Sequence, residues 1–339
     1  MNLIFKGKKI LPFLKIVTKI FNFLPSEFSH LLALKGLVVL TYLGFRVKAN
    51  ISKKLTFINI PLKNKLGLAA GLDKNGDYID ALASLGFGFL EIGTVTPRPQ
   101  PGNNKPRLFR IRSQQALVNN MGFNNKGVDY LVERVKKRKS KIPLGVSIGK
   151  NFDTPIGLAL DDYMTCLNSV YGIADYIAIN ISSPNTKNLR DLQSKKFIHQ
   201  LLSSIKDRQL ALASTEGYKP VLIKISPDMD KAELKILSES VLLNDLDGII
   251  CTNTTTSHNY YSGKGGLSGK PLFNSSTLTL KTLRGFVGNG FPIIASGGVM
   301  DLHTFQEKID NGADLVQIYT GFIFNGPSIV DEIINVKTQ

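Results

Sequence analysis

A short polar segment, residues 180–186 with the sequence Asn-Ile-Ser-Ser-Pro-Asn-Thr, carries side chains suited to chemistry. It closes the apolar run 176–181, whose branched side chains predict a buried strand. Pro184 fixes its own φ angle and removes a backbone donor, so the strand should stop there. Hydroxyl and carboxamide groups delivered at the end of a buried strand suit hydrogen bonding to a small polar molecule. Ser183 is therefore a candidate catalytic residue.

Lys224 is a second candidate, because it interrupts the apolar run 221–225. An unpaired ammonium is costly to bury, so this side chain should meet a negative charge. The N1–C2=O region of a reduced flavin would supply such a charge. Schiff-base formation is the alternative role for a lysine on a buried strand.

Histidine does not accompany Ser183, since His30, His199, His258 and His303 all fall outside the predicted strand ends. An ordinary Ser-His-Asp hydrolase is therefore not expected. A serine without an imidazole partner can accept a proton through a polarised site or a water chain. That chemistry suits the removal of a proton next to a carbonyl while a cofactor takes a hydride.

Eight short buried-strand patterns follow residue 60 and must position these side chains: residues 66–71, 89–94, 144–149, 176–182, 221–226, 248–254, 292–298 and 315–320. Helical stretches such as 231–243 and 302–312 separate them, and this alternation predicts parallel strands in a (β/α)8 TIM barrel. A doubly wound open sheet is the alternative, but no GxGxxG follows the first strand. The proline-rich stretch after the second strand predicts an extended excursion or hairpin over the barrel mouth.

The carboxyl ends of barrel strands form the active sites of such enzymes. Lys and Asn side chains are frequent at the predicted ends, which suits a planar anionic ligand rich in carbonyl and N–H groups. After the seventh strand, the turn Ala-Ser-Gly-Gly at 295–298 lets backbone N–H groups approach an anion. Together with Gly321 it predicts the phosphate site of a phosphorylated cofactor. A turn that needs glycine for geometry alone is the alternative.

The N-terminal region, residues 1–45, is predicted to form a helical element separate from the barrel at 46–339. Residues 10–24 show an amphipathic helical period, and Ser26 could cap a second helix that runs to about Tyr42. Their apolar surface predicts an interfacial element on a membrane, with packing against the barrel as the alternative. No stretch is long enough to span a bilayer, and no secretory signal is recognisable.

The composition sets wider bounds on partners. A formal net charge of +16 favours anions, which include nucleic acid, anionic lipid and small acidic substrates. Cys166 and Cys251 form no CxxC, so neither a disulfide framework nor a zinc site is expected.

Seven motifs, taken together, resemble one known family. They are residues 69–74 (AAGLDK), 91–103 (EIGTVTPRPQPGN), 121–125 (MGFNN), 180–186 (NISSPNT), 252–255 (TNTT), 265–269 (GGLSG) and 316–321 (VQIYTG). In this order and over essentially the whole chain they resemble dihydroorotate dehydrogenase, and within it the class 2, quinone-dependent and membrane-associated branch. The resemblance implies a barrel with FMN that oxidises (S)-dihydroorotate to orotate in pyrimidine biosynthesis. It implies a membrane quinone as the final electron acceptor.

The resemblance also assigns residues by position. Ser183 corresponds to the catalytic base, with Lys224 beside the flavin. The cofactor contacts it implies are Ala70, Gly71, Leu72, Asp73, Lys74, Thr94, Ser147, Asn180, Lys224, Thr252, Gly269, Gly298, Tyr319 and Thr320. The substrate contacts it implies are Lys74, Asn119, Asn120, Met121, Gly122, Phe123, Asn180, Asn185, Asn253 and Thr254. The quinone tunnel would be lined by His30, Arg110 and Tyr319.

Two positions depart from the family pattern. Asn120 stands where the family usually has Arg, and Ser147 where it usually has Asn, so we expect weakened contacts rather than lost activity. We further expect a monomeric peripheral protein on the anionic cytoplasmic face of the cell membrane, with no metal and no nucleic-acid partner. Two alternatives are an RNA-directed flavoenzyme of the tRNA-dihydrouridine synthase kind and a membrane-surface barrel without activity. The first would need an RNA-binding extension, and Lys74, Ser183 and Lys224 argue against the second.

Overall fold

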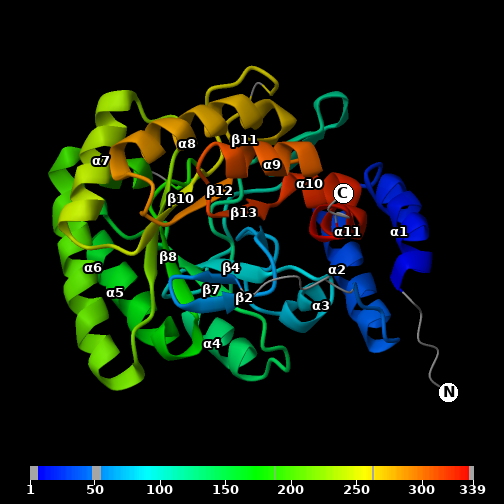
Figure 1. Ribbon diagram of the computed structural model, residues 1–339, viewed down its shortest axis with the longest axis horizontal. Coiled ribbons are helices and arrows are strands. Elements are labelled where there is room, and N and C mark those ends of the chain that lie inside the picture. The colour runs from blue at the N-terminus through cyan, green and yellow to red at the C-terminus, as the bar shows by residue number, and fades with distance from the viewer. Residues whose placement is uncertain (1–6, 48–54, 187, 262, 336–339) are drawn as a thin grey trace.

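The computed structural model describes residues 7–47, 55–186, 188–261 and 263–335. Its centre is a closed barrel of eight parallel strands with helices around the outside (Figure 1). The order around the barrel is β3 (Leu66–Leu68), β4 (Phe89–Val95), β7 (Leu144–Ile148), β8 (Tyr176–Asn180), β9 (Val221–Ile225), β10 (Gly248–Cys251), β12 (Ile293–Ser296) and β13 (Leu315–Ile318). The predicted (β/α)8 barrel is confirmed, and the closed strand order rules out a doubly wound open sheet.

The outer layer consists of helices that connect consecutive barrel strands. They are α3 (Ile79–Ala83), α4 (Val128–Lys136), α5 (Ala159–Val170), α6 (Lys195–Glu216), α7 (Lys231–Leu243), α8 (Phe273–Val287) and α9 (Leu302–Asp310), followed after β13 by α10 (Thr320–Asn325) and α11 (Pro327–Ile334). Asp230 caps α7 by accepting a hydrogen bond from the backbone N–H of Glu233, whose own side chain accepts one from the N–H of Asp230. This reciprocal capping box fixes the start of α7 at the predicted residue.

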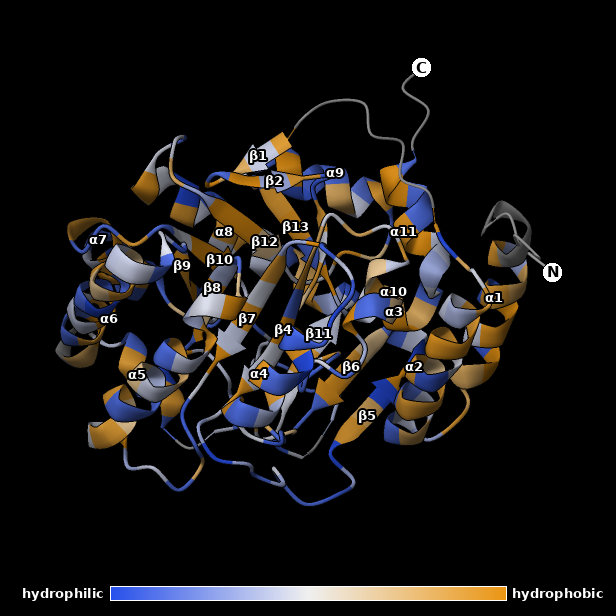
Figure 2. Cartoon of the chain, turned by 90° about the horizontal axis from the view of Figure 1, so that it is seen from below, coloured by the Kyte–Doolittle hydropathy of each residue, from blue (hydrophilic) through white to orange (hydrophobic). Residues whose placement is uncertain are grey.

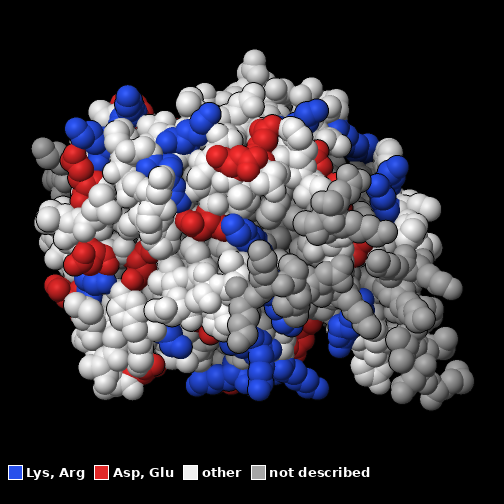
Figure 3. All heavy atoms as spheres, viewed as in Figure 1, with Lys and Arg blue, Asp and Glu red and all other residues white. Residues whose placement is uncertain are grey.

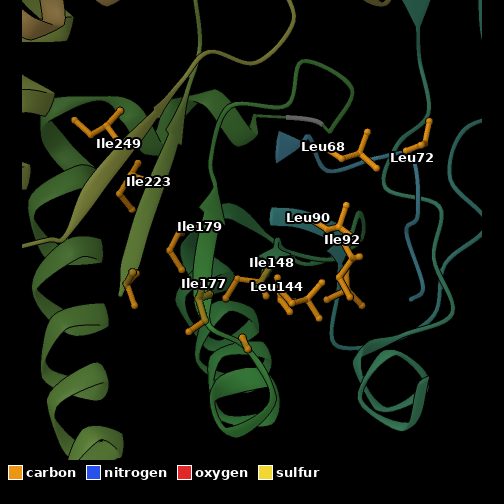
Figure 4. Close-up of a cluster of buried hydrophobic side chains, with 14 of the residues drawn as sticks. Leu68, Leu72, Leu90, Ile92, Leu144, Ile148, Ile177, Ile179, Ile223 and Ile249 are labelled. Carbon is orange, nitrogen blue, oxygen red and sulfur yellow. The ribbon is translucent and has the colours of Figure 1, made fainter. Parts of the chain in front are cut away.

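Alternate side chains of the barrel strands enter two separate hydrophobic layers. Leu90, Ile92, Ile177 and Ile179 point outward and pack beneath the helices (Figure 4). Other residues of the same strands point inward and fill the barrel, among them Phe89, Tyr176, Ala178, Leu222 and Ile250. This period of two is what a strand buried on both faces requires. Seven of the eight predicted strands are slightly too long, because their last residues leave the sheet and form the loops of the barrel mouth, whereas β4 runs one residue beyond its predicted end.

Two small antiparallel sheets close the two ends of the barrel. The hairpin of β1 (Leu55–Phe57) and β2 (Ile60–Leu62) shares the inner cluster with Phe89 and Leu315, the first residues of their strands, so it closes the amino-terminal end. At the other end, β5 (Leu108–Ile111), β6 (Ala116–Asn119) and β11 (Gly266–Gly269) form a three-stranded sheet. The sequence predicted an excursion or hairpin there but missed β11, which comes from a distant loop.

The N-terminal helices α1 (Gly7–Phe21) and α2 (Ser26–Tyr42) lie together at one side of the barrel, next to α10 and α11 (Figure 1). Arg110 of β5 holds the turn between them, because its guanidinium donates to the carbonyl oxygens of Asn22 at 2.9 Å and Leu24 at 3.1 Å. The predicted cap is wrong: Ser26 is already the first helical residue, and Pro25 occupies the N-cap position without a side-chain hydrogen bond.

The surface of these two helices is unusually apolar, as the orange helices of Figure 2 show. More than half of the exposed large hydrophobic side chains of the described chain lie between Phe13 and Leu43. The predicted apolar face of α1 is split, since Phe13, Ile16 and Ile20 are exposed while Val17 and Phe21 line a cavity. Among the described helices, none combines the length and the hydrophobicity needed to cross a membrane.

Candidate functional site

A cavity with an empty volume of about 1020 Å³, part of it open to solvent, lies at the carboxyl ends of the barrel strands. It brings together most of the predicted site residues: Ala70, Gly71, Lys74, Thr94, Asn119, Met121, Gly122, Phe123, Asn180, Ser183, Asn185, Lys224, Thr252, Asn253, Thr254, Gly269, Gly298, Tyr319 and Thr320. Neither Asp nor Glu is among the described residues that line it. Its charged lining residues are therefore Lys74 and Lys224, and the cavity suits an anionic ligand.

Four predicted contacts do not line this cavity. Ser147 is fully buried and reaches it only through Thr94, whose hydroxyl lies 2.8 Å from its own. The Asp73 carboxylate accepts backbone N–H groups of its own loop, at 2.7 Å from Tyr78, and Leu72 faces the N-terminal helices. The side-chain oxygen of Asn120 accepts from Asn103 at 2.7 Å. Leu72, Asp73 and Asn120 therefore belong to the loops around the site, and Ser147 supports Thr94 from within β7.

Ser183 is buried at the edge of the cavity, and its Oγ accepts a hydrogen bond from the backbone N–H of Asn185 at 3.3 Å. Arg190, which sequence reasoning missed, ties this loop to two others. Its guanidinium donates to the carbonyl oxygens of Ser182 at 3.0 Å and Thr254 at 2.9 Å, and it pairs with Asp228 at 2.6 Å. Neither Arg190 nor Asp228 stands out in the sequence, because charged residues in polar loops are common.

The carboxamides of the site hydrogen-bond to one another. Asn180 donates to Thr94 Oγ1 at 2.9 Å and accepts from Asn253 at 3.3 Å, while Asn185 donates to Asn119 at 2.8 Å. The Oδ1 atom of Asn185 is buried without a hydrogen-bond partner. An unsatisfied buried acceptor is costly, so this oxygen is available for an N–H group of a ligand.

The negative charge that Lys224 was expected to meet is provided by the protein itself. Its Nζ lies 3.3 Å from Oε1 of Glu91, a fully buried carboxylate on β4. Oε2 of Glu91 accepts from Tyr176 at 3.0 Å and from Gln317 at 2.8 Å. This pairing stabilises the charged ammonium, which argues against the Schiff-base alternative. Glu91 interrupts an apolar run as Lys224 does, so the same sequence argument could have found it.

Lys74 provides the second cation of the cavity. Its Nζ donates to the carbonyl oxygen of Gly71 at 2.8 Å. Burial, and secondarily the nearby Arg107, lower the pKa of Lys74 to about 8. The side chain is thus mainly protonated at neutral pH, and a bound anion would stabilise its charge further.

The end of the cavity formed by Gly297 and Gly298 fits the phosphate of FMN. Both residues have positive φ angles, and a Cβ on Gly298 would lie 2.3 Å from Cα of Phe273, the first residue of α8. Only glycine therefore lets this turn sit against the helix N-terminus, where the macrodipole favours an anion. Deeper in the cavity, Oε1 of Gln317 is buried without a partner and could accept a ring N–H. The donor and acceptor set suits the flavin ring as well.

A second, mainly apolar cavity with an empty volume of about 1000 Å³ lies between the N-terminal helices and the barrel. His30 and Arg110 line it, as predicted, whereas Tyr319 does not. Tyr319 instead lines the barrel-mouth cavity and a third cavity, with an empty volume of about 870 Å³. This third cavity shares Lys74 and Tyr319 with the barrel-mouth cavity and His30 and Leu72 with the apolar cavity, so it adjoins both. Burial, followed by the charge of Lys74, lowers the pKa of His30 to about 4, so its ring is neutral at pH 7.

Comparisons with known proteins point to one family. The dihydroorotate dehydrogenase family profile matches residues 52–337. A dihydroorotate dehydrogenase (quinone) from Acinetobacter baylyi is 48% identical over 322 residues, which cover 93% of this chain and 96% of that protein. The corresponding protein from Pectobacterium atrosepticum is 47% identical over 332 residues, covering 95% and 99%. The crystal structure of the Eimeria tenella enzyme in complex with ferulenol superposes with a TM-score of 0.81 at 31% identity, covering 90% of this chain and 89% of that one.

Proposed function

The chain belongs to the dihydroorotate dehydrogenase family, in its quinone-dependent branch, and we propose that its barrel-mouth cavity and its apolar cavity divide the reaction between them. The enzyme oxidises (S)-dihydroorotate to orotate in pyrimidine biosynthesis, with FMN as the hydride acceptor and a quinone as the final electron acceptor. The observation that carries the proposal is that Ser183, Lys74 and Lys224 line one cavity, and that the third cavity places Lys74 and Tyr319 of its lining next to His30 of the apolar cavity at α1 and α2.

The barrel-mouth cavity would hold the substrate through charge and carboxamide contacts. Lys74 pairs with the substrate carboxylate, and Asn119, Asn180, Asn185 and Asn253 bind its amide groups. Because these carboxamides already hydrogen-bond to one another, they are oriented before the substrate arrives. The unpartnered Oδ1 of Asn185 would gain a donor on binding.

Ser183 would remove the proton from C5 of dihydroorotate. A neutral hydroxyl can accept this proton only if it passes its own to a water chain that leads out of the site, so partial negative charge develops on Oγ as that proton leaves. The backbone N–H of Asn185, 3.3 Å away, is placed to stabilise that charge. Arg190 keeps the loop against the cavity by bonding to Ser182 on one side and Thr254 on the other. We expect the loop 183–191 to move as a lid, although Lys187 within it lies outside the described residues.

The cofactor would be held by residues from nearly every strand end. Gly297, Gly298 and Thr320 would hold the phosphate, and Lys224, Gln317 and Thr94 would bind the ring. Glu91 orients Lys224, because moving the amine away from its carboxylate would leave a buried anion without a partner.

The apolar cavity would admit the quinone, with His30 and Arg110 near its inner end. We propose that the exposed hydrophobic side chains of α1 and α2 rest on a membrane surface. Lys and Arg gather at the lower edge of the molecule in Figure 3. Arg134, Lys137 and Arg138 line a cleft that reaches Tyr42 at the end of α2, which favours an anionic surface. The cytoplasmic face, the monomeric state and the separateness of residues 1–45 stay predictions.

The family match over residues 52–337 argues against the RNA-directed alternative. The proposal is tested by anaerobic stopped-flow measurement of flavin bleaching by dihydroorotate. Ser183→Ala should bind FMN normally but lower the bleaching rate by roughly 10²–10⁴-fold, the usual contribution of a general base. Ser169→Ala, which removes an exposed hydroxyl on α5, is the control. Fast bleaching in the Ser183 variant would exclude Ser183 as the base.

A further inference from the structure

Lys308 on α9 is a buried cation that the proposed mechanism does not use. Its side chain is fully buried, and no Asp or Glu carboxylate lies within ion-pair distance of it among the described residues. Nζ donates to the hydroxyls of Ser276 at 2.6 Å and Thr277 at 2.8 Å, and it lies 4.8 Å from the centre of the Phe273 ring. Nζ therefore has two hydroxyl acceptors and an aromatic ring beside it, but no carboxylate close enough to form an ion pair.

Lys308 lies at the N-terminal end of α8, where a positive charge does not stabilise the fold. Phe273, Ser276 and Thr277 belong to the first turns of α8, where the helix macrodipole already places positive potential. A cation at a helix N-terminus is normally unfavourable. The first turn of α8 also contains no acidic residue. Two electropositive features thus coincide inside the protein without an anion of the described chain between them.

The hydrogen bonds of Lys308 lead directly to the cavity. Oγ of Ser276, which accepts from Lys308, lies 3.0 Å from the carbonyl oxygen of Gly297. Gly297 and Gly298 line the cavity, and Gly298 packs on Phe273, whose ring Lys308 faces. One side chain therefore supports both the glycine turn and the helix end that surround the expected phosphate. α8, α9 and α10 lie together on this side of the barrel (Figure 1).

We propose that Lys308 is a positioning residue that compensates the phosphate charge of the cofactor from behind the Gly297–Gly298 turn and so sets the preference for phosphorylated flavin. This inference rests on the proposed function, because it takes that turn as the phosphate site.

The titration of Lys308 supplies a second, independent readout. Burial lowers the pKa of Lys308 to about 8, and the groups that face it are the buried thiol of Cys251 on β10 and the neighbouring Glu307. A bound phosphate favours the charged ammonium, so binding should raise this pKa and take up a proton above pH 8. Affinity for FMN should then fall as the pH rises from 7 to 10. Affinity for riboflavin, which lacks the phosphate, should not change when Lys308 loses its proton.

The experiment compares dissociation constants of FMN and riboflavin for the full-length protein, measured by flavin fluorescence after removal and re-addition of flavin. Lys308→Met should weaken FMN roughly tenfold or more, the scale of one charge acting at close range inside a protein, and leave riboflavin within about twofold. Ser276 and Thr277 keep carbonyl partners in this variant, so no hydroxyl is left unpaired. Lys150→Met is the matched control, because Lys150 is also buried but donates only to carbonyl oxygens of its own loop.

Equal weakening of both flavins, or no change in either, would overturn the role of Lys308. If Lys308→Met does not fold, the pH dependence of flavin binding by the wild-type protein still tests the proposal. Its FMN-to-riboflavin affinity ratio should fall about tenfold between pH 7 and 10 if binding raises the pKa by one unit, and a flat ratio contradicts the proposal. Failure of the wild-type protein to bind either flavin would instead refute the proposed function, so the two failures are distinguishable.

Discussion

The two cavities of this enzyme are built in opposite ways. The barrel-mouth cavity is lined by buried and half-buried side chains that pair with one another or with residues behind them, such as Asn185 with Asn119 and Lys224 with Glu91. The apolar cavity is enclosed by two helices whose outer surface carries Phe13 and other exposed hydrophobic residues. The first arrangement fixes donors and acceptors before a ligand binds. The second arrangement provides hydrophobic contact area but few directional hydrogen bonds, which suits a long hydrophobic molecule better than a small polar one.

The largest expected effect concerns the buried ion pair between Lys224 and Glu91 and its contribution to stability. Glu91→Leu leaves the Lys224 ammonium buried without a carboxylate, so the free energy of unfolding should fall by about 3–5 kcal/mol. Urea denaturation followed by circular dichroism measures this change. The double variant Glu91→Leu with Lys224→Met should recover much of the loss, because no unpaired charge remains.

The exposed pair Lys235–Glu239 on α7 provides the control for this experiment. Glu239→Leu should change the free energy of unfolding by no more than about 1 kcal/mol, as is usual for exposed ion pairs. A similarly small cost for Glu91→Leu would show that the barrel interior tolerates an unpaired lysine, and the contrast between the cavities would lose its basis.

The second prediction separates the two half-reactions by filling the apolar cavity. Gly36 of α2 lines that cavity, and a Cβ built on it meets no atom within 4 Å. Gly36→Leu should therefore fold, with a gain of up to about 1 kcal/mol in helix stability. Turnover with a long-chain quinone should drop roughly tenfold, because the added side chain occupies apolar space, and the quinone then loses more binding free energy than one methylene group contributes. Flavin bleaching by dihydroorotate should not change.

Gly285→Leu is the matched control, since Gly285 also lies in a helix, on α8, and a Cβ added to it would likewise meet no atom within 4 Å. It should gain the same helix stability and keep full quinone turnover. Slowed bleaching in the Gly36 variant would mean that the apolar cavity takes part in substrate oxidation, and the two-cavity division would fail.

The third prediction uses pH to tell the two cavities apart. The pKa of Lys74 is lowered to about 8, so this side chain loses its proton as the pH rises through 8. If Lys74 pairs with the substrate carboxylate as proposed, kcat/KM for dihydroorotate should fall about tenfold per pH unit above that value. His30 has a pKa of about 4 and stays neutral from about pH 6 to 9, so kcat/KM for the quinone should be flat there.

Steady-state kinetics with each substrate varied in turn provide both profiles. Lys74→Arg should move the decline to higher pH, since a guanidinium remains charged throughout the range. A decline that is unchanged in this variant would assign the titration to another group.

The sequence predicted the parts of this molecule that obey a regular period. Eight strand patterns indicated the barrel, and polar residues at their ends indicated most of the cavity, from Lys74 to Thr320. The pairing partners were not predicted: Glu91, Gln317 and Arg190 meet their partners across the barrel or across loops. No local pattern encodes such contacts. Of the three-stranded sheet, only the hairpin of β5 and β6 was predicted. The third strand, β11, was missed because it joins them from a distant part of the chain.

The smallest expected effect concerns the two departures from the family pattern. Ser147 and Asn120 were expected to weaken contacts with flavin and substrate, but neither lines the cavity. The side chain of Asn120 accepts a hydrogen bond from Asn103, and its backbone N–H donates to the carbonyl oxygen of Arg107 at 2.8 Å. Asn120→Arg, which restores the residue usual in the family, should therefore change KM for dihydroorotate by no more than about twofold, because a cation outside the cavity and close to solvent is strongly screened. A roughly tenfold drop in KM, the size of one close ionic contact, would mean that the loop around Asn120 turns into the cavity when substrate binds. The barrel-mouth site would then be less preorganised than its hydrogen bonds indicate.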